Sequence, residues 1–467
     1  MPLFRRLFDV RHMLGGQAPM EELPGTRTLL RKTLAIAWPS TLESFLISLV
    51  GMVDTIMVSR LGAYAIAAVG LTNQPKFLGL CVFLALNVAV SALVARRKGE
   101  DDRDAANRVL KQALAITLVL SVVVSLLFLF FADSILALAG TNEDTHVYSA
   151  AYLRVVMGGM IFNMVTLVIN AAQRGAGNTK IAMRTNIVSN LVNICFNYLL
   201  INGIWIFPRW GVVGAAVATV LGTVAACAMA LYSVSQPESY LYLGLTEGFR
   251  LTRETLRSIW GLSSSTLVEQ VFVRIGFLIS AGIVARLGTV AFAAHQSGMN
   301  LINLSFSLGD GLSVAAVALV GQSLGAGRKD LAQIYGHLCQ RVGLFFSAAL
   351  SLLFIFMGRP LFSLFSSDPV ILAYGAQISR VIALTVFFQI STVIFSGCLR
   401  GAGDVKYVAT VSLVCITFVR PLAGYLLCYP LGLGLIGVWL SIALDQGLRV
   451  LLIYLRFARG RWVDIRI

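Results

Sequence analysis

The chain has 467 residues, of which 57% are apolar and only 13% are charged, and its mean hydropathy is +0.82. A soluble domain of this size would need far more charge to cover its surface, so the composition excludes an ordinary soluble protein. The net charge of +15 could indicate nucleic-acid binding. However, the basic residues lie in short gaps between long apolar runs, so we expect a membrane protein with no nucleic-acid partner.

Twelve long apolar runs predict an all-α membrane protein with twelve transmembrane helices, because about 20 apolar residues can cross a bilayer as a helix. Barrel strands would be shorter and would alternate in polarity. The expected spans are 34–58, 64–95, 109–131, 148–172, 181–202, 212–234, 256–284, 290–320, 336–357, 371–397, 407–428 and 435–456. Sixteen Lys/Arg residues lie in the even-numbered connections and four in the odd-numbered ones, which predicts that both termini are cytoplasmic.

An internal duplication relates two halves of six spans each. Arg174-Gly175-Ala176-Gly177 recurs as Arg400-Gly401-Ala402-Gly403, an offset of 226 residues. The same offset aligns Glu43 with Glu269, Arg60-Leu61-Gly62 with Arg286-Leu287-Gly288, Arg154-Val155 with Arg380-Val381, and Lys180 with Lys406. An ordered series at one offset indicates two pseudo-symmetric six-helix bundles that enter the membrane from the same side.

The expected organisation follows from the spans and the repeat. Residues 1–33 are amphipathic and lack the apolar stretch and cleavage site of a signal peptide, so we expect them on the cytoplasmic membrane surface. The remaining parts are an N-terminal lobe over 34–234, a cytoplasmic linker over 235–255, a C-terminal lobe over 256–456 and a cytoplasmic C-terminus over 457–467.

Ionisable residues inside spans cost a few kcal/mol each on insertion scales, so they are functional candidates by default. Asp54 lies late in the first span, and Asn193 and Asn197 share one face of the fifth because they are four residues apart. Together with Thr219 they could form a proton or sodium site in the first bundle. The alternative is a structural hydrogen-bond network.

The second bundle carries further candidates. Glu269 could face a cavity and attract cations, with Glu43, its repeat partner, on the opposite side, and Arg274 and Gln389 are further candidates for the lining of this cavity. Arg274 is five residues further on and does not face Glu269 directly. The alternatives are an internal ion pair for Glu269 or Arg274 and a near-surface structural role for Glu43.

For the other charged residues inside the spans, we favour structural roles. Asp310 lies in Gly309-Asp310-Gly311, which is expected to break the eighth span, and could be an ion site or a hinge contact. Arg420 and Asp445 are expected to pair with partners inside the second bundle. Arg154 and its repeat partner are expected to reach toward an interface.

The glycine motifs resemble phosphate loops only superficially. Both lack GxxxxGK[ST], and a glycine C-cap followed by a basic loop explains them better. The sequence has no HExxH, no CxxC pair and only four scattered histidines. We therefore expect no enzyme activity, no cofactor and no energy source other than an ion gradient.

The order and spacing of several short motifs resemble the multidrug and toxic compound extrusion (MATE) family from about residue 30 to 456. These motifs are Ala37-Trp38-Pro39, Val53-Asp54-Thr55 with Arg60-Leu61-Gly62, Arg174-Gly175-Ala176-Gly177-Asn178-Thr179, Leu319-Val320-Gly321-Gln322 with Gly325-Ala326-Gly327, and Leu399-Arg400-Gly401-Ala402-Gly403. The resemblance implies a twelve-helix, two-lobed antiporter.

The resemblance also implies residue roles. Asp54 matches the first-helix acid tied to cation coupling, and Glu269 matches a seventh-helix acid of the branch with a second-lobe site. Asn193 and Thr219 match polar first-lobe positions. Two departures matter, since one branch has aspartate at Asn197 and another has aspartate near Gln389.

Together these observations predict a monomeric, multi-pass protein of the cell membrane that exports organic cations or drugs by alternating access, in exchange for protons or sodium ions. Its partners would be small organic cations and the lipid bilayer, and a sodium ion could bind at Asp54. A flippase for lipid-linked or saccharide precursors, as in distant relatives of the same superfamily, is the alternative.

Overall fold

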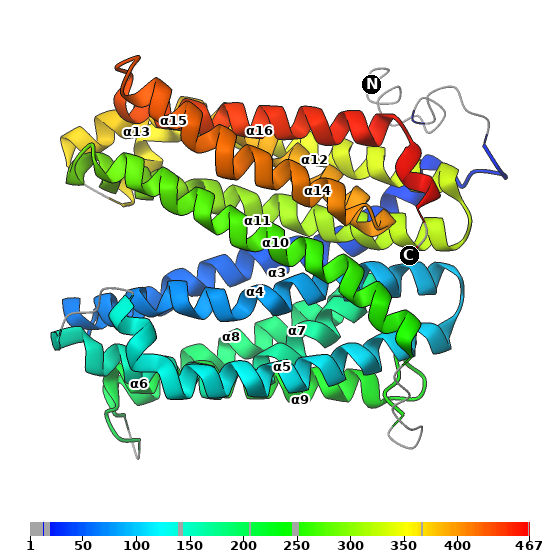
Figure 1. Cartoon of the computed structure of the whole chain (residues 1–467), viewed down its shortest axis with the longest axis horizontal. Helices are drawn as coiled ribbons and strands as arrows, with labels where there is room; N and C mark the ends of the chain where they lie inside the picture. Colours follow the sequence, from blue (N-terminus) through cyan, green and yellow to red (C-terminus); the bar gives the residue numbers. More distant parts are fainter. Residues whose placement is uncertain are drawn as a thin grey trace. The chain divides into compact units, whose positions relative to one another are not determined.

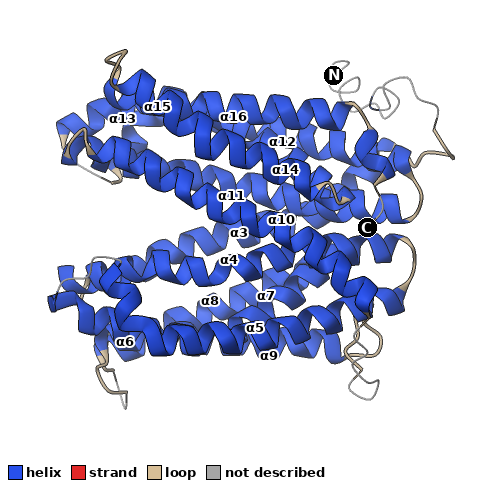
Figure 2. Ribbon diagram, in the orientation of Figure 1, coloured by secondary structure: helices blue, strands red, loops and turns tan. Residues whose placement is uncertain are grey.

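A computed structural model describes residue 13 and residues 19–138, 143–204, 207–244, 252–365, 368–465 and 467. Helices dominate these residues and no strand occurs among them (Figure 2). The all-α class predicted from the sequence is therefore confirmed.

The helices run in chain order with short connections (Figure 1). They are α3 (Thr26–Ser59), α4 (Ala63–Gly99), α5 (Arg103–Leu138), α6 (Glu143–Gly158), α7 (Met160–Gly175), α8 (Thr179–Asn202), α9 (Gly211–Ser235), α10 (Arg253–Ala285), α11 (Thr289–Gly325), α12 (Lys329–Ser363), α13 (Pro369–Ala402), α14 (Val405–Ser412), the π-helical η1 (Leu413–Val419), α15 (Arg420–Cys428), α16 (Gly434–Ala458) and the 3-10 helix η2 (Arg461–Asp464).

In the described part of the chain, ten helical stretches are long and apolar enough to cross a membrane, with α14, η1 and α15 counted as one. The bent pair α6 and α7, which meet at 47°, makes an eleventh. α8 is 24 residues long but is more polar, because it carries several asparagines, and it completes the expected twelve. The apolar runs therefore located the membrane helices correctly.

The duplication is visible in the backbone. α4 and α11 both have 37 residues, and they begin and end at positions that the offset of 226 relates. Gly62 and Gly288 precede these helices with positive φ angles of 118° and 104°. Gly177 and Gly403 follow α7 and α13 with φ angles of 85° and 93°. The two halves thus repeat the same turns, since both require a residue without a Cβ at the same place.

The two glycines of each repeated motif have different structural roles. Gly403 caps α13 in the left-handed conformation, which confirms the predicted glycine C-cap for the second motif. In the first motif Ala176 is the C-cap of α7, and Gly177 follows it with a positive φ angle. Gly401 instead lies against α11, where an added Cβ would be 2.6 Å from the Val317 carbonyl oxygen. Gly175 lies in the same way against the Ser91 carbonyl of α4, at the position that the repeat relates to Val317. The motif is therefore a helix-packing and helix-capping device.

The chain divides into two compact units. One contains Phe45–Ser263, and the other contains Met1–Ser44 together with Ser264–Ile467. We call them unit 2 and unit 1, respectively. The divisions fall inside α3 and α10, so each of these helices contributes to both units. The expected lobes 34–234 and 256–456 stay predictions.

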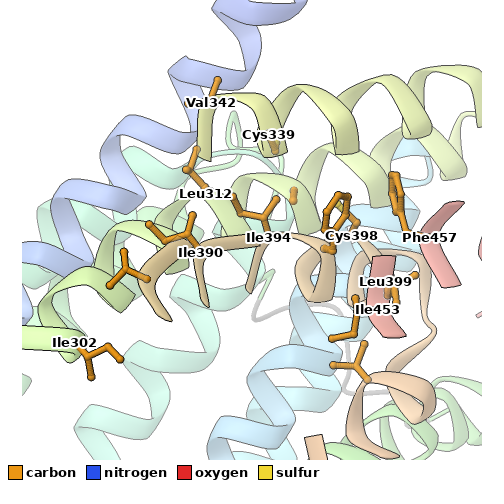
Figure 3. Packing of buried hydrophobic residues seen from close by; sticks show 14 of the residues in the cluster. Ile302, Leu312, Cys339, Val342, Ile390, Ile394, Cys398, Leu399, Ile453 and Phe457 are labelled. Carbon is orange, nitrogen blue, oxygen red and sulfur yellow. The ribbon is translucent and has the colours of Figure 1, made fainter. Parts of the chain in front are cut away.

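The core of unit 1 is built between α11, α12, α13 and α16. Figure 3 shows Leu312, Ile390 and Ile394 next to Cys339 and Val342. Gly343 lies directly against the Ile394 side chain, and such contacts between small and branched residues allow membrane helices to approach closely.

One expected helix break is absent. The sequence predicts that Gly309-Asp310-Gly311 interrupts the eighth span, but α11 is helical throughout Thr289–Gly325. The physical reason is packing: an added Cβ at Gly311 would meet the backbone of Thr41, and one at Gly309 would contact Ile390 at 3.5 Å. Here glycine serves close helix contact, which compensates for its low helix propensity.

Candidate functional site

Four side chains that the sequence analysis selected meet in one hydrogen-bonded chain inside unit 2. The Asn197 amide donates to the Asp54 carboxylate at 2.5 Å and to Asn193 Oδ1 at 3.2 Å. The Asn193 amide donates to the Thr219 hydroxyl at 3.3 Å. α3, α8 and α9 therefore each contribute to one polar site, as the shared helix face predicted.

Local packing explains why these groups meet. Asn193 and Asn197 are four residues apart on α8, so both point to the same side. Gly222 of α9 lies against the Ser189 carbonyl, where an added Cβ would be 2.6 Å from that oxygen and 3.2 Å from Asn193 Cβ. The absence of a side chain at Gly222 thus brings α9 close enough for Thr219, one turn earlier, to reach Asn193.

The site is rich in oxygen acceptors. Asn197 is fully buried, and its Oδ1 atom has no hydrogen-bond partner among the described residues. Asp54 is half-buried and supplies the negative charge. A buried acceptor without a donor is costly, so this oxygen is available to a proton-bearing group or to a cation.

Two residues of this site escaped the sequence analysis. Lys76 of α4 interacts electrostatically with Asp54, and its Nζ atom lies 5.8 Å from the centroid of the Tyr152 ring. Tyr152 of α6 is buried, and its hydroxyl is hydrogen-bonded to Thr219. A lysine within the apolar run 64–95 was the available signal for Lys76. Tyr152 gave none, because tyrosine is common in membrane helices.

In unit 1, Glu269 forms an ion pair. Arg400 of the second glycine motif donates to both Glu269 carboxylate oxygens, at 2.9 and 3.0 Å. The Glu269 side chain is 5% exposed. Glu269 was expected either to face a cavity or to form an internal ion pair, and the structure shows the ion pair. Its partner is an arginine that the sequence analysis placed in a basic loop.

The remaining candidates of unit 1 lie on three different helices. Glu43 is buried on α3 and belongs to the same compact unit as Glu269. Gln389 is buried on α13, and its Oε1 atom has no hydrogen-bond partner among the described residues. Arg274 is half-buried on α10. Their expected roles in a cavity stay predictions.

A buried charge cluster stabilises the C-terminal helices. Arg420 donates to Asp445 Oδ2 at 3.0 Å through Nε and at 2.5 Å through an Nη atom, and Arg449 lies 3.1 Å from the other carboxylate oxygen. The Arg420 guanidinium also lies 5.0 Å from the Phe277 ring centroid, within cation–π range. The expected pairing of Arg420 and Asp445 inside the second bundle is confirmed.

Two further charges have partners. Asp310 accepts a hydrogen bond from Ser44 at 3.2 Å. Arg154 donates to Asp133 at 2.6 Å, and the Asp133 side chain is 56% exposed. Among the described residues, no cluster of three or more His, Cys, Asp or Glu side chains is placed to hold a metal. At Asp54, a sodium ion would have one carboxylate and otherwise neutral oxygens.

A duplicated set of membrane helices with a carboxylate bonded to an amide inside one unit is typical of membrane transporters. The MatE family model matches two stretches of this chain, residues 39–199 and 266–426. The stretches are equally long, and their displacement of 227 residues (266 − 39) is within one residue of the internal repeat. The chain therefore belongs to the MatE family of MATE transporters.

Known proteins resemble the chain over nearly its whole length. A probable multidrug resistance protein NorM from Thermotoga maritima is 28% identical over 450 residues, with 95% of each chain covered. The multidrug resistance protein MdtK of Yersinia pestis is 27% identical, covering 93% of this chain and 95% of that protein.

Solved structures share the fold. An outward-facing multidrug resistance MATE family transporter has a TM-score of 0.85 at 22% identity, covering 94% of this chain and 98% of the other. A superfamily transporter from Pyrococcus furiosus, whose title describes a binding pocket of reverse polarity, has a TM-score of 0.87 at 22% identity, covering 96% of this chain and 100% of the other.

Proposed function

We propose that this transporter is a secondary active antiporter that exports organic cations or drugs in exchange for protons or sodium ions. Two relatives bear multidrug resistance names, which supports drugs as substrates. The observation that carries ion coupling is the Asp54–Asn197–Asn193–Thr219 chain, in which a lone carboxylate adjoins a buried oxygen without a partner among the described residues.

Coupling follows from charge. An ion from outside binds at Asp54 and neutralises the carboxylate, which changes the hydrogen bonds that join α3 to α8. Drug binding then weakens, because linkage makes the effects of ion and drug on one another reciprocal. One charge that moves inward gains about 2.3 kcal/mol per 100 mV of membrane potential, enough for roughly 50-fold accumulation of a neutral substrate.

The remaining expectations complete the proposal. The transporter lies in the cell membrane as a monomer, with both termini in the cytoplasm, since the connections on that side carry most of the basic residues. Its partners are small organic cations and lipid, and it uses no cofactor besides the coupling ion.

The test is transport by the purified, reconstituted protein. A cationic dye such as ethidium is loaded into proteoliposomes, and a proton or sodium gradient is imposed. Asp54→Asn should abolish gradient-driven dye movement, whereas Asp133→Asn, which removes an exposed carboxylate, should not. If the Asp54→Asn protein shows the same gradient-driven dye transport as the parent, the proposal is wrong. Movement of a fluorescent anionic lipid without any dye transport would favour the flippase.

A further inference from the structure

In each half of the repeat, the segment that follows the sixth span contacts the turn between the second and third spans of the same half. In unit 2 this segment is 236–243, after α9, and the turn joins α4 to α5. In unit 1 it is 461–465, after α16, and the turn joins α11 to α12. We call these two segments the straps.

The two turns are copies of one another. Asp101 and Gly327, which the offset of 226 relates, both have positive φ angles, of 55° and 74°. The helices that follow, α5 and α12, begin at Arg103 and Lys329, which are again one offset apart. The repeat therefore presents a cationic side chain at the same place in each unit.

The strap of unit 2 has a polar anchor, Arg103. Its Nε atom donates to the Tyr240 carbonyl at 3.0 Å, and its Nη2 atom donates to the carbonyls of Pro237 and Ser239 at 2.7 and 2.5 Å. A guanidinium has five donors in a fixed plane, so one side chain can bind three carbonyls. The Lys98 ammonium lies 3.4 Å from the centroid of the Tyr240 ring, within cation–π range.

Further contacts join the linker between the halves to α5. The Tyr242 N–H donates to Asn107 Oδ1 at 2.9 Å, and the neighbouring Leu241 is fully buried. At the far end of the linker, the Gln112 amide donates to Thr252 Oγ1 at 2.9 Å. The described residues at both ends of the linker are thus bound to the same helix of unit 2.

The strap of unit 1 has an apolar anchor, Trp462. This residue is fully buried, its ring stacks on Phe457 with centroids 5.0 Å apart, and its Nε1 atom donates to the Phe457 carbonyl at 2.7 Å. Lys329 reaches Asp464 at 2.5 Å, but the two side chains are 49% and 67% exposed. Exposed ion pairs contribute little to stability, whereas a buried tryptophan removes a large apolar area from water. Trp462 therefore takes the part that Arg103 has in unit 2.

We propose that the straps are a duplicated device that fixes the segment after each sixth span to its own unit. The linker that joins the two halves then moves with unit 2 and is not a free tether, because the strap 236–243 forms its first part. This inference goes beyond the proposed function, since it concerns how the halves are joined and not what is transported.

Hydrogen–deuterium exchange of the full-length protein in detergent tests the first strap. Hydrogen-bonded amides exchange when their segment opens. The Tyr242 amide donates to Asn107 and the Leu243 amide to a carbonyl at the end of α9, so both should be protected in the parent. Arg103→Gln should speed their exchange by about tenfold or more, which corresponds to ~1.4 kcal/mol of opening free energy.

Matched variants separate the anchors from other surface charges. Arg108→Gln removes another exposed arginine from α5 and should leave exchange in the strap unchanged. In unit 1, Lys329→Gln should change exchange over 461–465 by less than about twofold, whereas Trp462→Ala should raise it about tenfold. Exchange in α8 and α13 reports whether each variant is folded, and Trp462→Phe replaces Trp462→Ala if the latter does not fold.

A covalent lock tests whether the strap leaves unit 2 during transport. Asn107→Cys and Tyr242→Cys are combined with Cys195→Ser, because Cys195 is exposed and would react, and a short bismaleimide joins the new pair. The locked, reconstituted protein should transport ethidium at the rate of the same protein labelled at either new cysteine alone.

The outcomes distinguish two failures. Rapid exchange of 236–243 in the parent, equal exchange in Arg103→Gln and Arg108→Gln, or loss of transport on locking overturns the inference. If the parent transports no ethidium, the proposed function fails, and the exchange measurements still decide whether the straps are fixed.

Discussion

Gly401 offers a direct test of how the repeated motif works. An added Cβ at this position would lie 2.6 Å from the Val317 carbonyl oxygen and 2.9 Å from Val317 Cα, closer than real Cβ atoms approach backbone. Backbone cannot rotate away as a side chain can, so α13 must move from α11. Overpacking of this kind costs about 1–3 kcal/mol. We therefore expect Gly401→Ala to destabilise unit 1, and Gly175→Ala to destabilise unit 2 comparably through the Ser91 carbonyl.

Gly261 is the matched control for both variants. It lies in α10 with nothing within 4 Å of an added Cβ, so Gly261→Ala should gain up to about 1 kcal/mol from helix propensity. For a unit of roughly 200 residues, ~1 kcal/mol corresponds to about 2–4 °C. Thermal melting of the detergent-solubilised protein therefore distinguishes the opposite signs. Equal stabilisation by Gly401→Ala and Gly261→Ala would refute the packing role.

Three further perturbations test other features. Asp445→Ala leaves Arg420 and Arg449 buried without their counter-ion, so thermal melting should show a loss of about 3–5 kcal/mol, and the added change Arg420→Met should restore part of it. Burial raises the pKa of Tyr240 from 10.0 to about 12, so the stability that its neutral phenol contributes is present below pH 10 and is lost as the pH rises through about 12. The pKa is measured from the difference in ultraviolet phenolate absorbance between the parent and Tyr240→Phe as the pH is raised. A Tyr240 pKa near the ordinary value of 10.0 would contradict the prediction. Glu269→Gln should lower the melting temperature while gradient-driven dye transport persists, since Glu269 is paired with an arginine. Loss of transport in a folded variant would contradict this prediction.

The repeat shows how far sequence matching reaches. A constant offset in the amino-acid sequence identifies the equivalent glycines, and the φ angles at Gly177 and Gly403 agree with it. Aligning the two motifs did not show which glycine allows the chain to turn and which one packs against the neighbouring helix. That distinction depends on the neighbouring helix, as the contact between Gly401 and Val317 shows.

The site was predicted in part. Asn193, Asn197 and Thr219 were grouped with Asp54 because helical periodicity places two of them on one face, and polar groups inside a membrane helix are few. Lys76 was not grouped with them. Its electrostatic influence on Asp54 depends on how α4 is rotated in the folded unit, which hydropathy does not encode.

The sequence by itself determined the membrane class, the helices and the duplication. These properties depend only on the order of residues along the chain, since the bilayer requires apolar runs of a given length and gene duplication preserves the spacing of motifs. Only the tertiary structure decided which charges meet: Glu269 pairs with Arg400, 131 positions away, and Asp54 with Asn197, 143 positions away. The physical reason is that such pairs form where helix faces come together in packing, and many pairings are compatible with the same apolar pattern.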